Sequence, residues 1–97
     1  MISPVDPVIR AVAQEMHLSE DALLKQGARA LLERQLRQIK TQIFEITSRY
    51  GVSSVEEMEA RYREGTLEEA DSWRDAQRLD HLEYERDRLQ QLLEALV

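Results

Sequence analysis

Both prolines of this chain lie within its first seven residues, at Pro4 and Pro7, and about ninety residues follow without another. Proline breaks a helix interior because it lacks a backbone N–H and its ring clashes with the preceding turn. The remainder holds only three glycines, and no sustained alternation of apolar and polar residues marks a strand. This feature predicts an all-α protein, and a chain of 97 residues suits one domain spanning residues 1–97.

Start and stop signals divide the chain into helices. Pro7 suits the first turn of a helix, Ser19 can cap a second, and Gly51 can end it in a left-handed conformation. Ser53 or Ser54, followed three residues later by Glu56 or Glu57, can form a capping box for a third helix, which Gly65 ends. Thr66, followed by Glu69, predicts a capping box for a fourth. The helices are therefore expected over about residues 6–16, 20–49, 54–64 and 67–96.

The two longest expected helices each carry a seam of apolar residues at steps of three and four, the spacing that keeps one face toward a partner helix. The first seam is Leu32, Leu36, Ile39, Ile43, Ile46 and Tyr50, and the second is Leu79, Leu82, Arg86, Leu89, Leu93 and Leu96. Antiparallel pairing would join Leu32 to Leu96 at one end and Tyr50 to Leu79 at the other. We therefore expect a long antiparallel helical hairpin, with a short helix before it and a short connecting helix within it.

A hairpin buries only one face of each helix, so the first helix or a second chain must cover what remains. We expect a homodimer, with self-association through Leu32, Leu36, Ile39, Ile43, Leu82, Leu89 and Leu93. Arg86 interrupts its seam opposite Ile43. Its side chain is expected to extend to Glu45 or to solvent, and the alternative is that it fixes the register of the two helices.

The charge is unevenly divided. Residues 1–50 hold seven Lys or Arg and six Asp or Glu, a net +1, whereas residues 51–97 hold six and thirteen, a net −7. Residues 54–71 alone hold seven acids and two arginines, a net −5. Such a block repels nucleic acid and attracts a basic protein surface, although a charge run is also typical of a solvated helix face.

Residues that carry catalysis are scarce. The chain has no Cys and two His, and it lacks a glycine-rich phosphate loop or a serine with a histidine nearby. His81 and Glu85 lie one turn apart, but two ligands from one helix do not make a metal site. We expect no enzyme activity, no catalytic residue, no cofactor and no metal. No apolar run or signal peptide is visible, so we expect a cytoplasmic protein that does not enter a membrane.

Residues 8–32 read as a short helix, a Leu-Ser turn and a second amphipathic helix. This segment resembles the two helices of a ribbon-helix-helix repressor, and the resemblance implies DNA-binding autoregulation. That family reads DNA with a polar strand ahead of the first helix, whereas residues 2–7 hold two prolines and an acid, and Glu20 and Asp21 would repel a phosphate. We do not expect nucleic acid as the partner. A basic stripe is nevertheless present at Lys25, Arg29, Arg34, Arg37 and Lys40.

A second segment runs Tyr50-Gly51-Val52-Ser53-Ser54-Val55-Glu56-Glu57-Met58-Glu59-Ala60-Arg61-Tyr62, with Trp73 and then Asp80-His81-Leu82-Glu83-Tyr84-Glu85 further on. With the residues from Ile43 that precede it, this pattern resembles small helical antitoxin components of prokaryotic toxin–antitoxin pairs. The resemblance implies a non-enzymatic protein that binds and masks a toxin.

An acidic helical surface with aromatic side chains suits a basic protein, because charge speeds the encounter and aromatic anchors hold the complex. We therefore expect masking of a basic, ribonuclease-type toxin through the acidic C-terminal half. The expected contacts are Met58, Tyr62, Trp73, Asp80 and Tyr84. For Met58, Tyr62 and Trp73 the alternative is a place in the core, whereas Tyr84 lies off the seam. Two other functions stay open: a self-associating assembly protein, and a DNA-binding autoregulator acting through the N-terminal helices.

Overall fold

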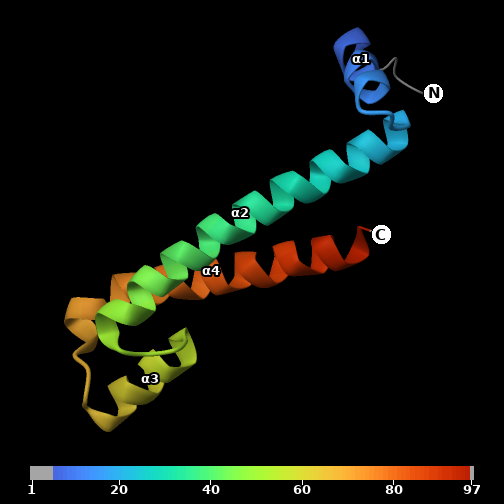
Figure 1. Ribbon diagram of the computed structural model, residues 1–97. Coiled ribbons are helices and arrows are strands. Elements are labelled where there is room, and N and C mark those ends of the chain that lie inside the picture. Colours follow the sequence, from blue (N-terminus) through green and yellow to red (C-terminus); the bar gives the residue numbers. More distant parts are fainter. Residues whose placement is uncertain (1–5, 97) are drawn as a thin grey trace.

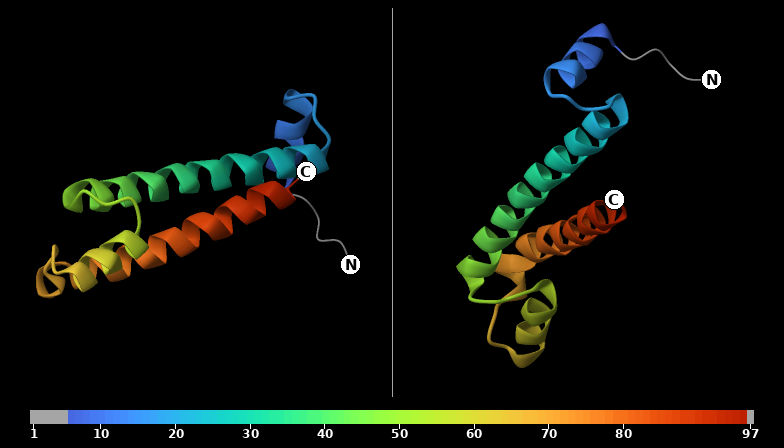
Figure 2. Two further views of the ribbon diagram at one scale, coloured as in Figure 1. Left: turned by 90° about the horizontal axis from the view of Figure 1, so that it is seen from below. Right: turned by 45° about the vertical axis from the view of Figure 1, so that its right-hand side comes forward.

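A computed structural model describes residues 6–96, which form four helices (Figure 1). Their bounds are α1 Pro7–Glu15, α2 Glu20–Tyr50, α3 Val55–Glu64 and α4 Glu69–Ala95. The long helices α2 and α4 lie side by side and antiparallel, α3 lies in the connection between them, and α1 lies at the opposite end of α2 (Figures 1 and 2). No strand occurs within residues 6–96. The all-α helical hairpin predicted from the sequence is confirmed.

Most helix ends are fixed by the residues that the sequence suggests. The Ser19 hydroxyl accepts from the Ala22 N–H at 3.0 Å, and the Ser54 hydroxyl accepts from the Glu57 N–H at 3.1 Å. Such bonds satisfy backbone donors that the first helical turn leaves unpaired. Gly51 ends α2 with a φ of 63°, a left-handed conformation that glycine adopts without the steric cost of a Cβ.

The prediction that Thr66 caps the fourth helix is wrong. α4 begins at Glu69, and its N-cap residue Glu68 makes no side-chain capping bond. The reason is that Thr66 completes the end of α3 instead: its backbone N–H donates to the Arg61 carbonyl at 3.0 Å, beside the Gly65 N–H, which donates to the Tyr62 carbonyl. Since this stretch closes one helix, the next starts later than its sequence suggests.

The core lies where α2, α3 and α4 meet. Its buried members are Ile39, Ile43, Ile46, Val52, Met58, Ala76, Leu79 and Leu82. Met58 and Leu79 are fully buried, and Tyr62 and Leu89 pack against the cluster. Burial fades toward the free ends of the hairpin, where Leu32 and Leu93 are only half-buried. The two seams therefore pack tightly near the connection and loosely beyond Leu36.

This packing corrects part of the predicted self-association surface. Leu36, Ile39, Ile43 and Leu82 are buried within one chain, so the hairpin itself covers them. The remaining three predicted residues, Leu32, Leu89 and Leu93, are half-buried. The four buried residues are therefore not available to a second chain, whereas the three half-buried ones stay candidates. Arg86 does extend outward, but it bonds the neighbouring Asp87 at 3.0 Å and not Glu45.

A polar cluster joins the end of α2 to α4. The Asp75 carboxylate accepts from the Tyr50 hydroxyl at 2.5 Å and from the Arg49 guanidinium at 2.8 Å. The Tyr50 ring still packs against the core, while its hydroxyl forms the hydrogen bond to Asp75. The Arg61 guanidinium donates to the carbonyls of Tyr50 and Gly51 at 3.1 and 2.9 Å, which ties α3 to the end of α2.

This cluster makes the stability of the hairpin depend on pH. The Tyr50 hydrogen bond, with help from Arg49, holds the pKa of Asp75 below its usual value. A carboxyl with a lowered folded pKa stabilises the fold above its unfolded pKa of about 3.9, and that contribution is lost as the pH falls toward the folded pKa. We expect the free energy of unfolding to decrease below about pH 5, and to decrease less steeply in Asp75→Asn.

Urea unfolding at several pH values between 7 and 2, followed by circular dichroism, measures this slope. The matched control is Asp71→Asn, which removes an exposed carboxylate of the same helix that forms no ion pair within residues 6–96. Equal slopes for the Asp75 and Asp71 variants would show that Asp75 contributes nothing specific.

Candidate protein-binding site

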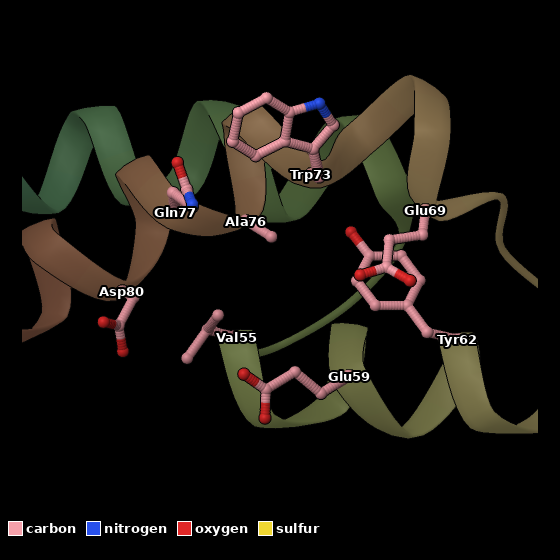
Figure 3. A pocket seen from close by; sticks show the side chains of 8 residues that line it. All are labelled: Val55, Glu59, Tyr62, Glu69, Trp73, Ala76, Gln77 and Asp80. Carbon is pink, nitrogen blue, oxygen red and sulfur yellow. The ribbon is translucent and has the colours of Figure 1, made fainter.

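A groove runs between α3 and α4 and encloses about 260 Å³ (Figure 3). It is lined by Val55, Glu59 and Tyr62 of α3 and by Glu69, Trp73, Ala76, Gln77 and Asp80 of α4. In Figure 3, Val55 rises from α3 toward α4 and Glu59 lies along α3, while Ala76 and Asp80 descend from α4. The Trp73 indole stands at the rim, with 43% of the residue exposed.

Helical spacing explains why these residues line one surface. The α3 residues follow one another at steps of four and three, and so do Glu69, Trp73, Ala76 and Asp80 on α4. Residues three and four apart lie on the same helix face. The Ser54 cap sets where α3 begins, and with it which of its residues face α4.

Two hydrogen-bonded contacts hold the walls together. The Glu83 carboxylate of α4 accepts from the Val55 N–H of α3 at 2.9 Å. The Ser72 hydroxyl donates to the Glu68 carbonyl at 2.8 Å, so its proton is used and the Tyr62 hydroxyl donates to it, also at 2.8 Å. Ser72 is buried, so this chain of bonds is shielded from water. The groove is thus positioned before any ligand arrives.

The groove is rich in negative charge. Glu59, Glu69 and Asp80 are exposed, and none of them pairs with a cation within residues 6–96. Aromatic rings lie among them, and the Arg74 guanidinium already lies 5.9 Å from the centre of the Trp73 ring. Carboxylates and aromatic faces are the groups that bind Arg and Lys side chains. The arrangement therefore suits a cationic side chain from another protein.

The groove unites three of the five predicted contact residues. Tyr62, Trp73 and Asp80 line it together. Met58 is wrong as a contact residue, because it is 0% exposed and fills the core beneath α3. Tyr84 is 70% exposed but lies one turn beyond Asp80 and borders a separate hollow near Ile39.

Sequence reasoning missed Glu59 and Glu69. The signal was present, since Glu59 lies three residues before Tyr62, and Glu69 lies four residues before Trp73. Each carboxylate therefore shares a helix face with an aromatic residue. The missing element was the placement of α3 against α4, which the spacing within one helix does not specify.

Two other candidates from the sequence are the His81 and Glu85 pair on α4 and the basic stripe on α2. His81 pairs with Glu85 at 2.6 Å, and within residues 6–96 no three His, Cys, Asp or Glu side chains gather in a way that could hold a metal. No helix of that part is long and apolar enough to cross a membrane. In the basic stripe, Lys25 pairs with Asp21 at 3.4 Å and Arg29 donates to the Leu96 carbonyl at 2.5 Å.

The ribbon-helix-helix resemblance would place a strand at residues 2–7. Of these residues the structure describes only Asp6 and Pro7. Asp6 caps α1 by accepting from the Val8 N–H at 2.7 Å, and Pro7 is the first residue of that helix.

Comparison with known proteins gives a family and no close relative. A family model described as "Uncharacterized protein MJ0235 family" matches residues 1–97, so the chain belongs to that family. No curated protein and no solved structure matches the chain.

Proposed function

We propose that this member of the MJ0235 family is a non-enzymatic module that binds a basic protein at the groove between α3 and α4. The observation that carries the proposal is the groove itself, which is lined by two aromatic side chains and by three carboxylates without ion-pair partners in the described chain. Isolated surface acids would be an ordinary solvated face, but their presence in one groove with aromatic residues favours a binding site.

The chemistry of the groove suits a cationic protein side chain, because carboxylates and aromatic faces bind Arg and Lys. The groove encloses about 260 Å³. An Arg or Lys side chain would lie between Tyr62 and Trp73, with its charge toward Glu59, Glu69 or Asp80. The surrounding charge of −5 over residues 54–71 would speed the encounter with a basic surface.

The proposed partner is a basic toxin of the ribonuclease type, which this protein would mask. The support is the resemblance of residues 43–85 to antitoxin components, since that segment includes α3 and all the residues of α4 that line the groove. Masking requires only that the toxin's basic substrate-binding surface be covered, so no catalytic residue is needed in this chain.

Co-expression with the proteins encoded beside this chain, followed by purification and calorimetric titration, tests the proposal. We expect a stoichiometric complex with one basic protein. Trp73→Ala should weaken its affinity at least tenfold, because truncating an aromatic anchor in an interface costs about 2 kcal/mol or more.

The matched control is Phe44→Ala, which truncates another exposed aromatic residue on α2, outside the groove. It should leave the affinity unchanged. Recovery of no basic partner, or equal loss of affinity in both variants, would overturn the proposed function.

A further inference from the structure

An apolar surface that no other part of residues 6–96 covers lies at the end of the molecule remote from the groove. We call it the N-terminal apolar face; it consists of Val8, Ile9, Val12, Met16, Leu24 and Leu31. Val8, Met16, Leu24 and Leu31 are each more than half exposed. Between α1 and α2 the face is hollowed, and Ile9, Val12, Leu24 and Leu31 line the hollow together with Gly27 and Ala28. A contiguous apolar surface of this kind marks an interaction site on a soluble protein.

The helices that carry this face are poorly supported by their own chain. α1 has nine residues, and Ala13 is the only one of them that is buried. In α2 no residue before Leu36 is buried, although Leu23, Leu24 and Leu31 precede it. Helices shorter than about 12 residues are marginal in water, so α1 depends on packing, and within residues 6–96 that packing buries Ala13 alone of its residues.

We propose that the N-terminal apolar face is a homodimer interface, in which α1 and the first half of α2 pack against the same elements of a second copy. The six side chains expose on the order of 500 Å², and a polar rim would bring this near the roughly 800 Å² that each partner contributes to a standard interface. The radius of gyration, 19.8 Å, exceeds the roughly 13 Å of a compact domain of this length because the hairpin is elongated.

The charge of this face is compatible with a second copy as its occupant. Residues 6–35 hold four basic and five acidic side chains, a net −1. Two pairs of them already neutralise each other, Arg10 with Glu20 at 3.0 Å and Lys25 with Asp21 at 3.4 Å. Two copies can therefore meet here with little repulsion. Meeting through α3 instead would oppose two blocks of −5, which is unfavourable.

The location of the face keeps the two surfaces separate. α1 lies at the end of α2 opposite α3, so pairing there leaves the groove uncovered (Figures 1 and 2). A two-fold dimer would then present two grooves to its surroundings. This inference does not rest on the proposed function, because the purified chain alone forms the dimer.

Sedimentation equilibrium of the purified chain tests the proposal. We expect a dimer at micromolar concentration, and Leu24→Glu with Leu31→Glu should raise its dissociation constant at least a hundredfold while helicity persists. The control is Phe44→Glu with Tyr84→Glu, which adds the same charge at two exposed aromatic residues outside the face. A monomeric wild-type chain, or equal dissociation of both double variants, would overturn the proposal.

A covalent test avoids charged substitutions. The chain has no cysteine, so single cysteines at Val8, Met16 or Leu31 report contacts between copies directly. Under mild oxidation we expect at least one of them to form a disulfide-linked dimer well above the level of Phe44→Cys. Yields no higher than that control at all three positions would contradict an interface on this face.

Discussion

Reversing the three groove carboxylates together is expected to abolish binding of the basic partner. The variant Glu59→Lys, Glu69→Lys and Asp80→Lys places three positive charges beside Tyr62 and Trp73. Removing one member of a close interfacial charge pair costs about 2–5 kcal/mol, and a like-charge juxtaposition adds to that loss. We therefore expect the affinity to fall by at least a thousandfold, as measured by calorimetry. The difference between the variant and the wild type should narrow at 0.5 M salt, because salt screens both the attraction in the wild type and the repulsion in the variant.

The chain offers a closely matched control for this variant. Glu33→Lys, Glu45→Lys and Glu94→Lys changes three exposed carboxylates outside the groove that form no ion pair within residues 6–96. Both triple variants move the formal net charge from −6 to 0, so they differ only in where the charge sits. Similar losses in both would mean that overall charge, and not the groove, governs the interaction.

Truncation of Leu79 is expected to be the most damaging single change to the fold. This side chain is fully buried in the cluster where α2, α3 and α4 meet. Leu→Ala changes at such positions cost about 3–5 kcal/mol, from lost burial and from the cavity that remains. Domains of this size have only about 5–15 kcal/mol of stability. We expect urea unfolding of Leu79→Ala to show a loss of about 3 kcal/mol.

Leu92→Ala is the comparison for that measurement. Leu92 lies on the same helix but is 38% exposed, and it is absent from the core cluster. Its truncation should cost less than about 1 kcal/mol, since surface positions away from special features change stability little. A cost for Leu79→Ala no greater than that of Leu92→Ala would contradict a core centred on the connection end of the hairpin.

The sequence specifies the helices well because their signals are local. Ser19, Gly51, Ser54 and Gly65 set the helix ends through bonds to residues a few positions away, and the structure follows all four. The hairpin pairing is also encoded, because both seams repeat at heptad spacing over several turns. The Thr66 prediction was wrong because Thr66 belongs to the motif that ends α3 and therefore does not form the capping box of α4.

The site was harder to predict because it depends on contacts between helices. Met58 and Tyr62 are four residues apart on α3, and their sequence context treats them alike, yet Met58 is buried and Tyr62 lines the groove. Which of the two reaches the surface is decided by how far α3 rotates against α4. That rotation is set by contacts such as Glu83 to Val55, over 28 residues of sequence. The N-terminal apolar face has the same origin, since α2 extends beyond the part that α4 covers tightly.

Nuclear magnetic resonance of the isotope-labelled chain, titrated with the co-purified basic partner, tests the binding site most directly. The proposed function predicts that the backbone amides of Glu59, Tyr62, Glu69 and Asp80 and the Trp73 indole N–H shift or broaden most. Amides of the N-terminal apolar face, such as Leu24, should remain unaffected. Perturbations concentrated on α1 and the first half of α2, with the groove unchanged, would contradict the assignment of the partner to the acidic groove.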